Sequence, residues 1–186
     1  MSATTLDPRT ALVVVDLQNG IVRIPSAQPH TAADIVERSG RLAAAFREKG
    51  LPVVLVRVTG GAPGRTENSR GAGGELPADW ADLAPGLGRQ DSDIVVTKQV
   101  WGAFHGTDLD LQLRRKGVTQ VVLTGAATSI GVESTARAAY EHGYNVTVAV
   151  DAVTDMDESA HRNAVEKIFP RLGETDTTDA IIKLLG

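Results

Sequence analysis

Apolar residues along the chain alternate between short continuous runs and longer stretches with helical spacing. The short runs are rich in β-branched residues, which is typical of strands buried on both faces of a parallel sheet. The predicted strands are Ala11–Val15, Val53–Val58, Ile94–Thr97, Thr119–Leu123 and Asn145–Val150. The predicted helices are Thr31–Lys49, Asp108–Lys116, Gly131–His142, Ser159–Ile168 and Asp176–Leu185.

This alternation of strands and helices predicts an α/β fold. We expect a three-layer α/β/α sandwich with a Rossmann-like, mostly parallel sheet of about six strands, with residues 1–186 forming a single domain. Ligands of such sheets bind outside the carboxyl ends of the strands. Polar or small residues just after the strands, namely Asp16, Lys98 and Gly131, are therefore the first candidates for a common site.

Composition narrows the range of functions. The chain has 186 residues, 42% of them hydrophobic, and a formal net charge of −4. This charge gives no support for binding to nucleic acid or to an anionic membrane. The N-terminal residues lack the basic and apolar regions of a signal peptide, so a cytoplasmic location is expected. The chain has no cysteine, which excludes disulfides and thiol catalysis.

Asp16 and Lys98 could act together in proton transfer. Asp16 follows an aliphatic run, where burial disfavours the charged carboxylate, while a nearby lysine would favour it. A carboxyl group balanced in this way can exchange protons near neutral pH. A structural ion pair, or an aspartate that caps the next turn, explains the same residue types.

The segment Leu123–Tyr144 predicts a strand, a tight turn and a helix. Amide groups at such a helix start are free to point into a crevice at the end of the sheet. Gly131, in the turn, would let a substrate approach the backbone closely.

Three motifs make the chain resemble the isochorismatase-like, or cysteine hydrolase, superfamily. They are VVVDLQNG at Val13–Gly20, KQVWGAFHGTDLD at Lys98–Asp110, and the GxxTxxxVxxTAR pattern at Gly125–Arg137. Most members carry a cysteine nucleophile where this chain has Gly131, whereas true isochorismatases are similar in lacking it. The resemblance implies that Asp16 protonates a vinyl ether carbon with help from Lys98, and that water then attacks the oxocarbenium ion. A non-proline cis peptide is implied within Ala126–Thr128, before the threonine, although an ordinary tight turn fits the same residues.

The resemblance also implies a small-molecule substrate, no metal, no cofactor, and a homodimer or homotetramer. Residues close to the motifs are candidate substrate contacts. They are Gln18, Trp101, Phe104, Ala127 and Thr128. For Trp101 and Phe104, helical spacing fits a place in the core equally well. Arg23, Arg65 and Arg70 could meet a substrate carboxylate, although each also fits a solvated surface charge.

Alternative functions remain at this level. A member that has lost catalysis could serve as a small-molecule binding or assembly module. Ser129, in a variant of the nucleophile elbow, could work with His161 and one of Asp151, Asp155 or Asp157, as in α/β-hydrolases.

The glycine-rich segment Gly60–Gly74 is expected to be a mobile lid. His30, His105, His142 and His161 have no metal-binding spacing.

Overall fold

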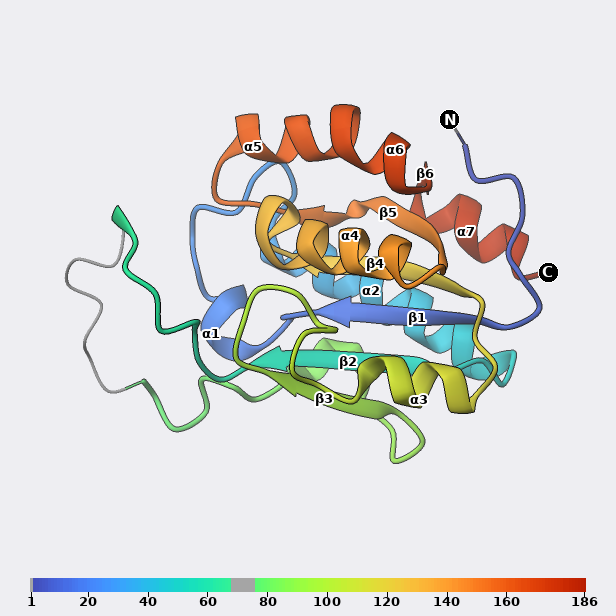
Figure 1. Cartoon of the computed structure of the whole chain (residues 1–186), viewed down its shortest axis with the longest axis horizontal. Coiled ribbons are helices and arrows are strands. Elements are labelled where there is room, and N and C mark those ends of the chain that lie inside the picture. Colours follow the sequence, from blue (N-terminus) through green and yellow to red (C-terminus); the bar gives the residue numbers. More distant parts are fainter. Residues whose placement is uncertain (1, 68–75) are drawn as a thin grey trace.

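Within residues 2–67 and 76–186, which the computed structural model describes, six strands form one parallel sheet in the order β3-β2-β1-β4-β5-β6 (Figure 1). The strands are β1 (Thr10–Val15), β2 (Val53–Val58), β3 (Ile94–Lys98), β4 (Gln120–Ala126), β5 (Asn145–Thr154) and β6 (Glu174–Asp176). The helices are α1 (Asn19–Val22), α2 (Ala32–Glu48), α3 (Leu109–Arg115), α4 (Glu133–Glu141), α5 (Glu158–Asn163), α6 (Phe169–Leu172) and α7 (Thr178–Leu184). The α/β fold with a parallel sheet is therefore confirmed.

Alternate residues of the central strand β1 point into two separate cores. Leu12 and Val14 pack with α2 and α7 on one face, while Ala11, Val13 and Val15 pack with α3, α4 and α6 on the other. Every residue of β1 is buried because helices cover both faces of the sheet. This burial explains the continuous apolar runs in the sequence and fixes β1 at the centre of the molecule.

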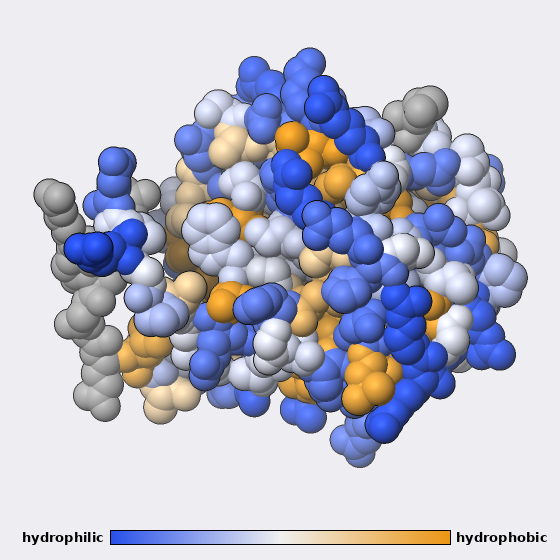
Figure 2. All heavy atoms as spheres, viewed as in Figure 1, coloured by the Kyte–Doolittle hydropathy of each residue, from blue (hydrophilic) through white to orange (hydrophobic). Residues whose placement is uncertain are grey.

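The element boundaries differ from the expected ones mainly near the C-terminal part of the sheet. Strand β5 continues past Asp151 to Thr154, because the pairing register shifts between Leu123 and Gly125 of β4. The Asp151 carboxylate accepts hydrogen bonds from the backbone and side chain of Thr178, which starts α7. The short strand β6, Glu174–Asp176, had no apolar run to predict it. The face seen in Figure 2 carries mostly hydrophilic side chains with scattered hydrophobic ones. No helix among the described residues is long and apolar enough to cross a membrane.

Candidate active site

Asp16 is the first residue after β1, and its backbone turns sharply out of the sheet. Its φ is 55°, in the left-handed region that few residues other than glycine adopt and that aspartate tolerates better than most. Its backbone N–H still donates to the carbonyl of Val56, at 3.0 Å, so the turn is anchored to β2. The turn places the side chain at the carboxyl edge of the sheet.

Lys98, the last residue of β3, forms an ion pair with Asp16. Lys98 Nζ lies 2.7 Å from Asp16 Oδ2, and both side chains are nearly inaccessible, with exposed fractions of 2% and 8%. The ammonium also donates to the carbonyl oxygen of Val100, at 3.0 Å. The structure thus brings together two residues 82 positions apart, as expected from the parallel topology.

The environment of Asp16 favours the protonated carboxyl more strongly than the environment of a solvent-exposed aspartate does. Burial raises the pKa of Asp16 to about 6, although the charge of Lys98 and its hydrogen bond act in the opposite direction. Asp16 Oδ1 is buried and has no hydrogen-bond partner among the described residues. Leaving one oxygen of a buried carboxylate without a hydrogen bond costs free energy, which favours the protonated form. With a pKa of about 6, the carboxyl can hold and release a proton close to neutral pH.

Gly131 lies directly against the carboxyl of Asp16. It belongs to a single π-helical turn, Thr128–Val132, that leads into α4. A Cβ atom at position 131 would lie 3.1 Å from Asp16 Oδ2 and 3.1 Å from Val15 Cγ1. The absence of a side chain there leaves the Asp16 carboxyl open to a ligand from this side.

The turn around Gly131 has the expected cis peptide, and three of its amides already have hydrogen-bond partners in the protein. The peptide bond between Ala126 and Ala127 is cis. The N–H of Ser129 donates to Asp155 Oδ2, and those of Ile130 and Val132 donate to the carbonyl of Ala127. These three amides are therefore not available to a substrate, which corrects the expectation of free amides for this part of the turn.

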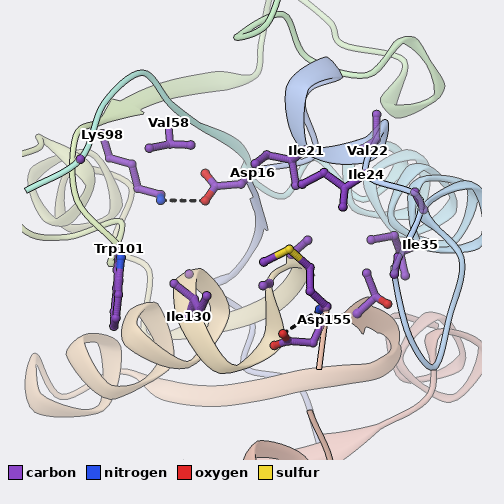
Figure 3. A pocket seen from close by; sticks show the side chains of 18 of the residues that line it. Asp16, Ile21, Val22, Ile24, Ile35, Val58, Lys98, Trp101, Ile130 and Asp155 are labelled. Atoms are coloured by element: carbon purple, nitrogen blue, oxygen red, sulfur yellow. Dashed lines mark hydrogen bonds and ion pairs between the residues drawn. The ribbon is translucent and has the colours of Figure 1, made fainter. Parts of the chain in front are cut away.

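A cavity of about 220 Å³ opens beside these residues and is mostly apolar (Figure 3). Asp16, Lys98, Gly131, Trp101 and Ala127 all line it, as expected. Trp101 stands at its rim with 64% of its surface exposed. A space of this size accommodates a small molecule.

Three predicted substrate contacts do not line the cavity. Gln18 is fully buried: its amide donates to the carbonyls of Val58 and Trp80 and accepts from the N–H of Val58, which makes it a structural residue. Phe104 packs in the core, stacked on the ring of His142 at 5.1 Å. Thr128 is fully buried, and its hydroxyl contacts Nδ1 of His161 at 2.9 Å.

The groups of the serine-hydrolase alternative do not assemble. Ser129 Oγ donates to Asp155 Oδ2 at 2.8 Å, whereas His161 contacts Thr128 instead of Ser129. A serine nucleophile needs a base within hydrogen-bond distance, and a buried aspartate that already accepts other hydrogen bonds is a poor one. Ser129 and Asp155 therefore act as a structural link between the turn and the end of β5.

Other expectations concern charges, metals and the glycine-rich loop. Arg23 pairs with Asp79 on the surface at 2.7 Å, and Arg70 lies outside the described residues. Gly60 and Gly61, at the start of the glycine-rich segment, line the cavity, whereas residues 68–74 of the expected lid lie outside the described part of the chain. Among the described residues, no group of three or more His, Asp or Glu side chains could hold a metal ion.

The apolar wall of the cavity was not predicted from the sequence. Ile21 and Val22 of α1, Ile24 just after it, and Ile35 of α2 line one side. The run IVRI at residues 21–24 was a signal, because apolar residues directly after a catalytic motif have no strand or long helix to explain them. Met156, after β5, lines the cavity as well.

A cysteine at position 131 would test the contact with Asp16. We expect Gly131→Cys to fold with a loss of about 1–3 kcal/mol, since its neighbours must shift by only a few tenths of an ångström. The wild type has no cysteine, so iodoacetamide labelling followed by mass spectrometry reports on this thiol alone. Adding Asp16→Asn should speed alkylation, because a neighbouring carboxylate raises a thiol pKa and Lys98 lowers it. Equal rates in the single and double variants would contradict this arrangement.

Known proteins share both the sequence and the fold. Residues 10–180 match the Isochorismatase domain family. The uncharacterized isochorismatase family protein YecD of Escherichia coli O157:H7 is 44% identical over 181 residues, covering 95% of this chain and 96% of YecD. The ureidoacrylate amidohydrolase RutB of Methylobacterium radiotolerans is 32% identical over 211 residues, covering 97% of this chain and 81% of RutB.

Among solved structures, an isochorismatase family protein from Burkholderia thailandensis superimposes with a TM-score of 0.92. It is 46% identical, and the match covers 97% of each chain. This likeness extends over the strands that carry Asp16 and Lys98. The chain therefore belongs to the isochorismatase-like family of hydrolases.

Proposed function

We propose that this protein hydrolyses a vinyl ether in a small molecule, with Asp16 as general acid and base, Lys98 as its charged partner, and no covalent enzyme intermediate. One observation carries the proposal: the buried Asp16 carboxyl, with a pKa of about 6, borders a cavity directly beside Gly131, a position at which the family resemblance implies a cysteine nucleophile in most members. The site offers a proton and no thiol.

The proposed reaction balances without a cofactor. The protonated Asp16 carboxyl gives its proton to the terminal vinyl carbon, whose double-bond electrons form the new C–H bond. The positive charge that results is shared with the ether oxygen and is stabilised by the Asp16 carboxylate. Water attacks the cationic carbon and returns a proton to Asp16, and the hemiacetal then separates into an aldehyde and an alcohol. Each turnover leaves Asp16 protonated again.

Among the described residues, Lys98 has partners for two of its three N–H groups, which leaves one donor for the substrate. An ammonium carries three N–H groups, and two of them are directed at Asp16 and the Val100 carbonyl. The third would meet the ether oxygen as the alcohol leaves. Trp101 and Ala127, which line the cavity beside this point, would hold the substrate in place.

We also propose that the protein forms a homodimer or homotetramer, which sedimentation velocity would test.

The decisive experiment follows the transferred proton. Purified protein in D2O is incubated with cyclohexyl vinyl ether, and the acetaldehyde released is trapped by borohydride and analysed by mass spectrometry. Protonation at carbon predicts one solvent deuteron in the methyl group of the product. Amides and ureides are tested in parallel. Turnover of these without any vinyl ether hydrolysis would overturn the proposal, and no turnover of any class would favour a catalytically silent binding module.

Replacing Lys98 by Met should move the pH profile in a predictable direction. A general acid must be protonated, so kcat/KM should fall as pH rises through about 6 in the wild type. Lys98 lowers the pKa of Asp16, and its removal should shift this fall to higher pH, by about one unit or more. Lys167→Met, at an exposed position, is the control and should leave the profile unchanged. An unshifted profile in Lys98→Met would mean that another group is titrating.

A further inference from the structure

One wall of the cavity is apolar and lies beside Asp16, where the reaction is proposed to occur. Figure 3 shows Asp16 between Lys98 on one side and Ile21, Val22 and Ile24 on the other, with Ile35 beyond them. These aliphatic side chains come from α1, the segment after it and α2. On this side of the cavity, a ligand whose reacting group touches Asp16 can place the rest of its body against aliphatic carbon.

Two other polar side chains of the cavity, those of Asp155 and Thr154, already have hydrogen-bond partners. Asp155, only 4% exposed, accepts from the N–H and hydroxyl of Ser129 and from the N–H groups of Met156 and Asp157. Thr154 donates to the carbonyl of His30 at 2.6 Å. Neither side chain is free to recognise a polar substituent on a substrate without losing these bonds.

The charges of the cavity disfavour an anionic ligand. Among the described lining residues Lys98 is the single cation, and its charge is already matched by Asp16. The Asp155 carboxylate adds negative charge to the same cavity. A carboxylate brought into this space would lose its hydration and could meet only the remaining N–H of Lys98, whose charge Asp16 already offsets at pH 7.5, so its burial is unfavourable.

From these features we infer that the substrate is an uncharged molecule with an aliphatic or alicyclic body. The body lies against Ile21, Ile24 and Ile35, and the reacting group lies at Asp16 with the Lys98 ammonium and the Trp101 indole beside it. This inference rests on the proposed function for the identity of the reacting group, but the preference for a neutral body is a property of the cavity itself.

Binding of two matched saturated ethers separates this inference from catalysis. Cyclohexyl ethyl ether and 4-ethoxycyclohexanecarboxylate have no vinyl group, so neither can be turned over, and their binding to the wild type at pH 7.5 is measured by calorimetry. We expect the neutral ether to bind at least about tenfold more tightly. Equal or tighter binding of the carboxylate would overturn the inference whether or not vinyl ethers are hydrolysed. Conversely, absent hydrolysis with this binding preference intact would overturn only the proposed function.

A cation placed in the apolar wall should reverse the preference. Ile24 is half-buried at the cavity, so Ile24→Arg can present a guanidinium to a carboxylate with bidentate geometry. We expect this variant to bind the carboxylate about tenfold more tightly than the wild type does, and the neutral ether more weakly. Ile24→Leu is the matched control and should keep the wild-type preference.

A second cationic variant provides the same test if Ile24→Arg does not fold. Val22→Lys, also half-buried on this wall, should change the preference in the same direction. If both cationic variants fold, as judged by circular dichroism, and neither gains affinity for the carboxylate, the wall does not contact the body of the ligand and the inference is wrong.

Discussion

An Asp16→Asn variant is expected to hydrolyse vinyl ethers at least about 10³-fold more slowly than the wild type. An amide has nearly the same shape as the carboxyl and can still accept a hydrogen bond from Lys98, but it cannot supply a proton at neutral pH. Lys98 Nζ lies 2.7 Å from Asp16 Oδ2, so the amide can keep this hydrogen bond and we expect the substitution to leave the neighbouring residues in place. The measurement is kcat/KM from the release of aldehyde, between pH 5 and 8.

The control for this variant is a second buried ion pair far from the cavity. Arg47 Nη2 lies 2.7 Å from Asp93 Oδ2, with side-chain exposures of 11% and 1%. Asp93→Asn removes a buried carboxylate in the same way and should lower stability by roughly 3–5 kcal/mol, yet leave kcat/KM of the folded protein unchanged. Retained turnover in Asp16→Asn, or an equal loss in Asp93→Asn, would remove Asp16 from the proposed reaction.

The meeting of Asp16 and Lys98 could be predicted because it depends on topology. Each residue follows a buried strand, and the carboxyl ends of parallel strands share one edge of the sheet. The order of strands places β2 between β1 and β3, so the two side chains must reach across one strand. Their observed contact shows that long side chains at the edge can do so, which the sequence alone does not settle.

The roles of Gln18, Phe104 and Thr128 could not be predicted in the same way. All three lie within the motifs, but proximity in sequence does not determine which face of a loop turns to the cavity. Phe104 turns into the core, beneath the ring of His142. Gln18 supplies hydrogen bonds to Val58, a backbone partner 40 residues away. Such partners exist only in the folded state.

The hydrogen-bond partners of the amides before α4 also could not be predicted from the sequence. A strand–turn–helix pattern predicts unpaired N–H groups at the helix start, and the glycine supports a close approach. In the structure the turn is π-helical, and Asp155 from the bulged end of β5 satisfies the amide of Ser129. The register shift that brings Asp155 there comes from β4 pairing with β5, and no local pattern encodes it.

Gly125 holds the centre of the sheet at the point where β1 turns into Asp16, and Gly125→Ala is expected to be severely destabilising. Its φ is +122°, and a Cβ atom there would lie 2.0 Å from the carbonyl oxygen of Val15 and 2.7 Å from its nitrogen. Both contacts are with backbone of the paired strand, which cannot move aside as a flexible side chain would. We expect the free energy of unfolding, measured by urea denaturation, to fall by at least about 4 kcal/mol.

Gly143→Ala separates the effect of this clash from that of backbone conformation. Gly143 follows α4 with a φ of +82°, and a Cβ atom there would meet nothing within 4 Å. It carries only the conformational cost of a left-handed residue, about 1–2 kcal/mol. Comparable losses in the two variants would mean that Gly125 is needed for its φ alone. A much larger loss in Gly125→Ala, accompanied by loss of turnover in whatever fraction folds, would show that the close approach of β4 to Val15 positions Asp16.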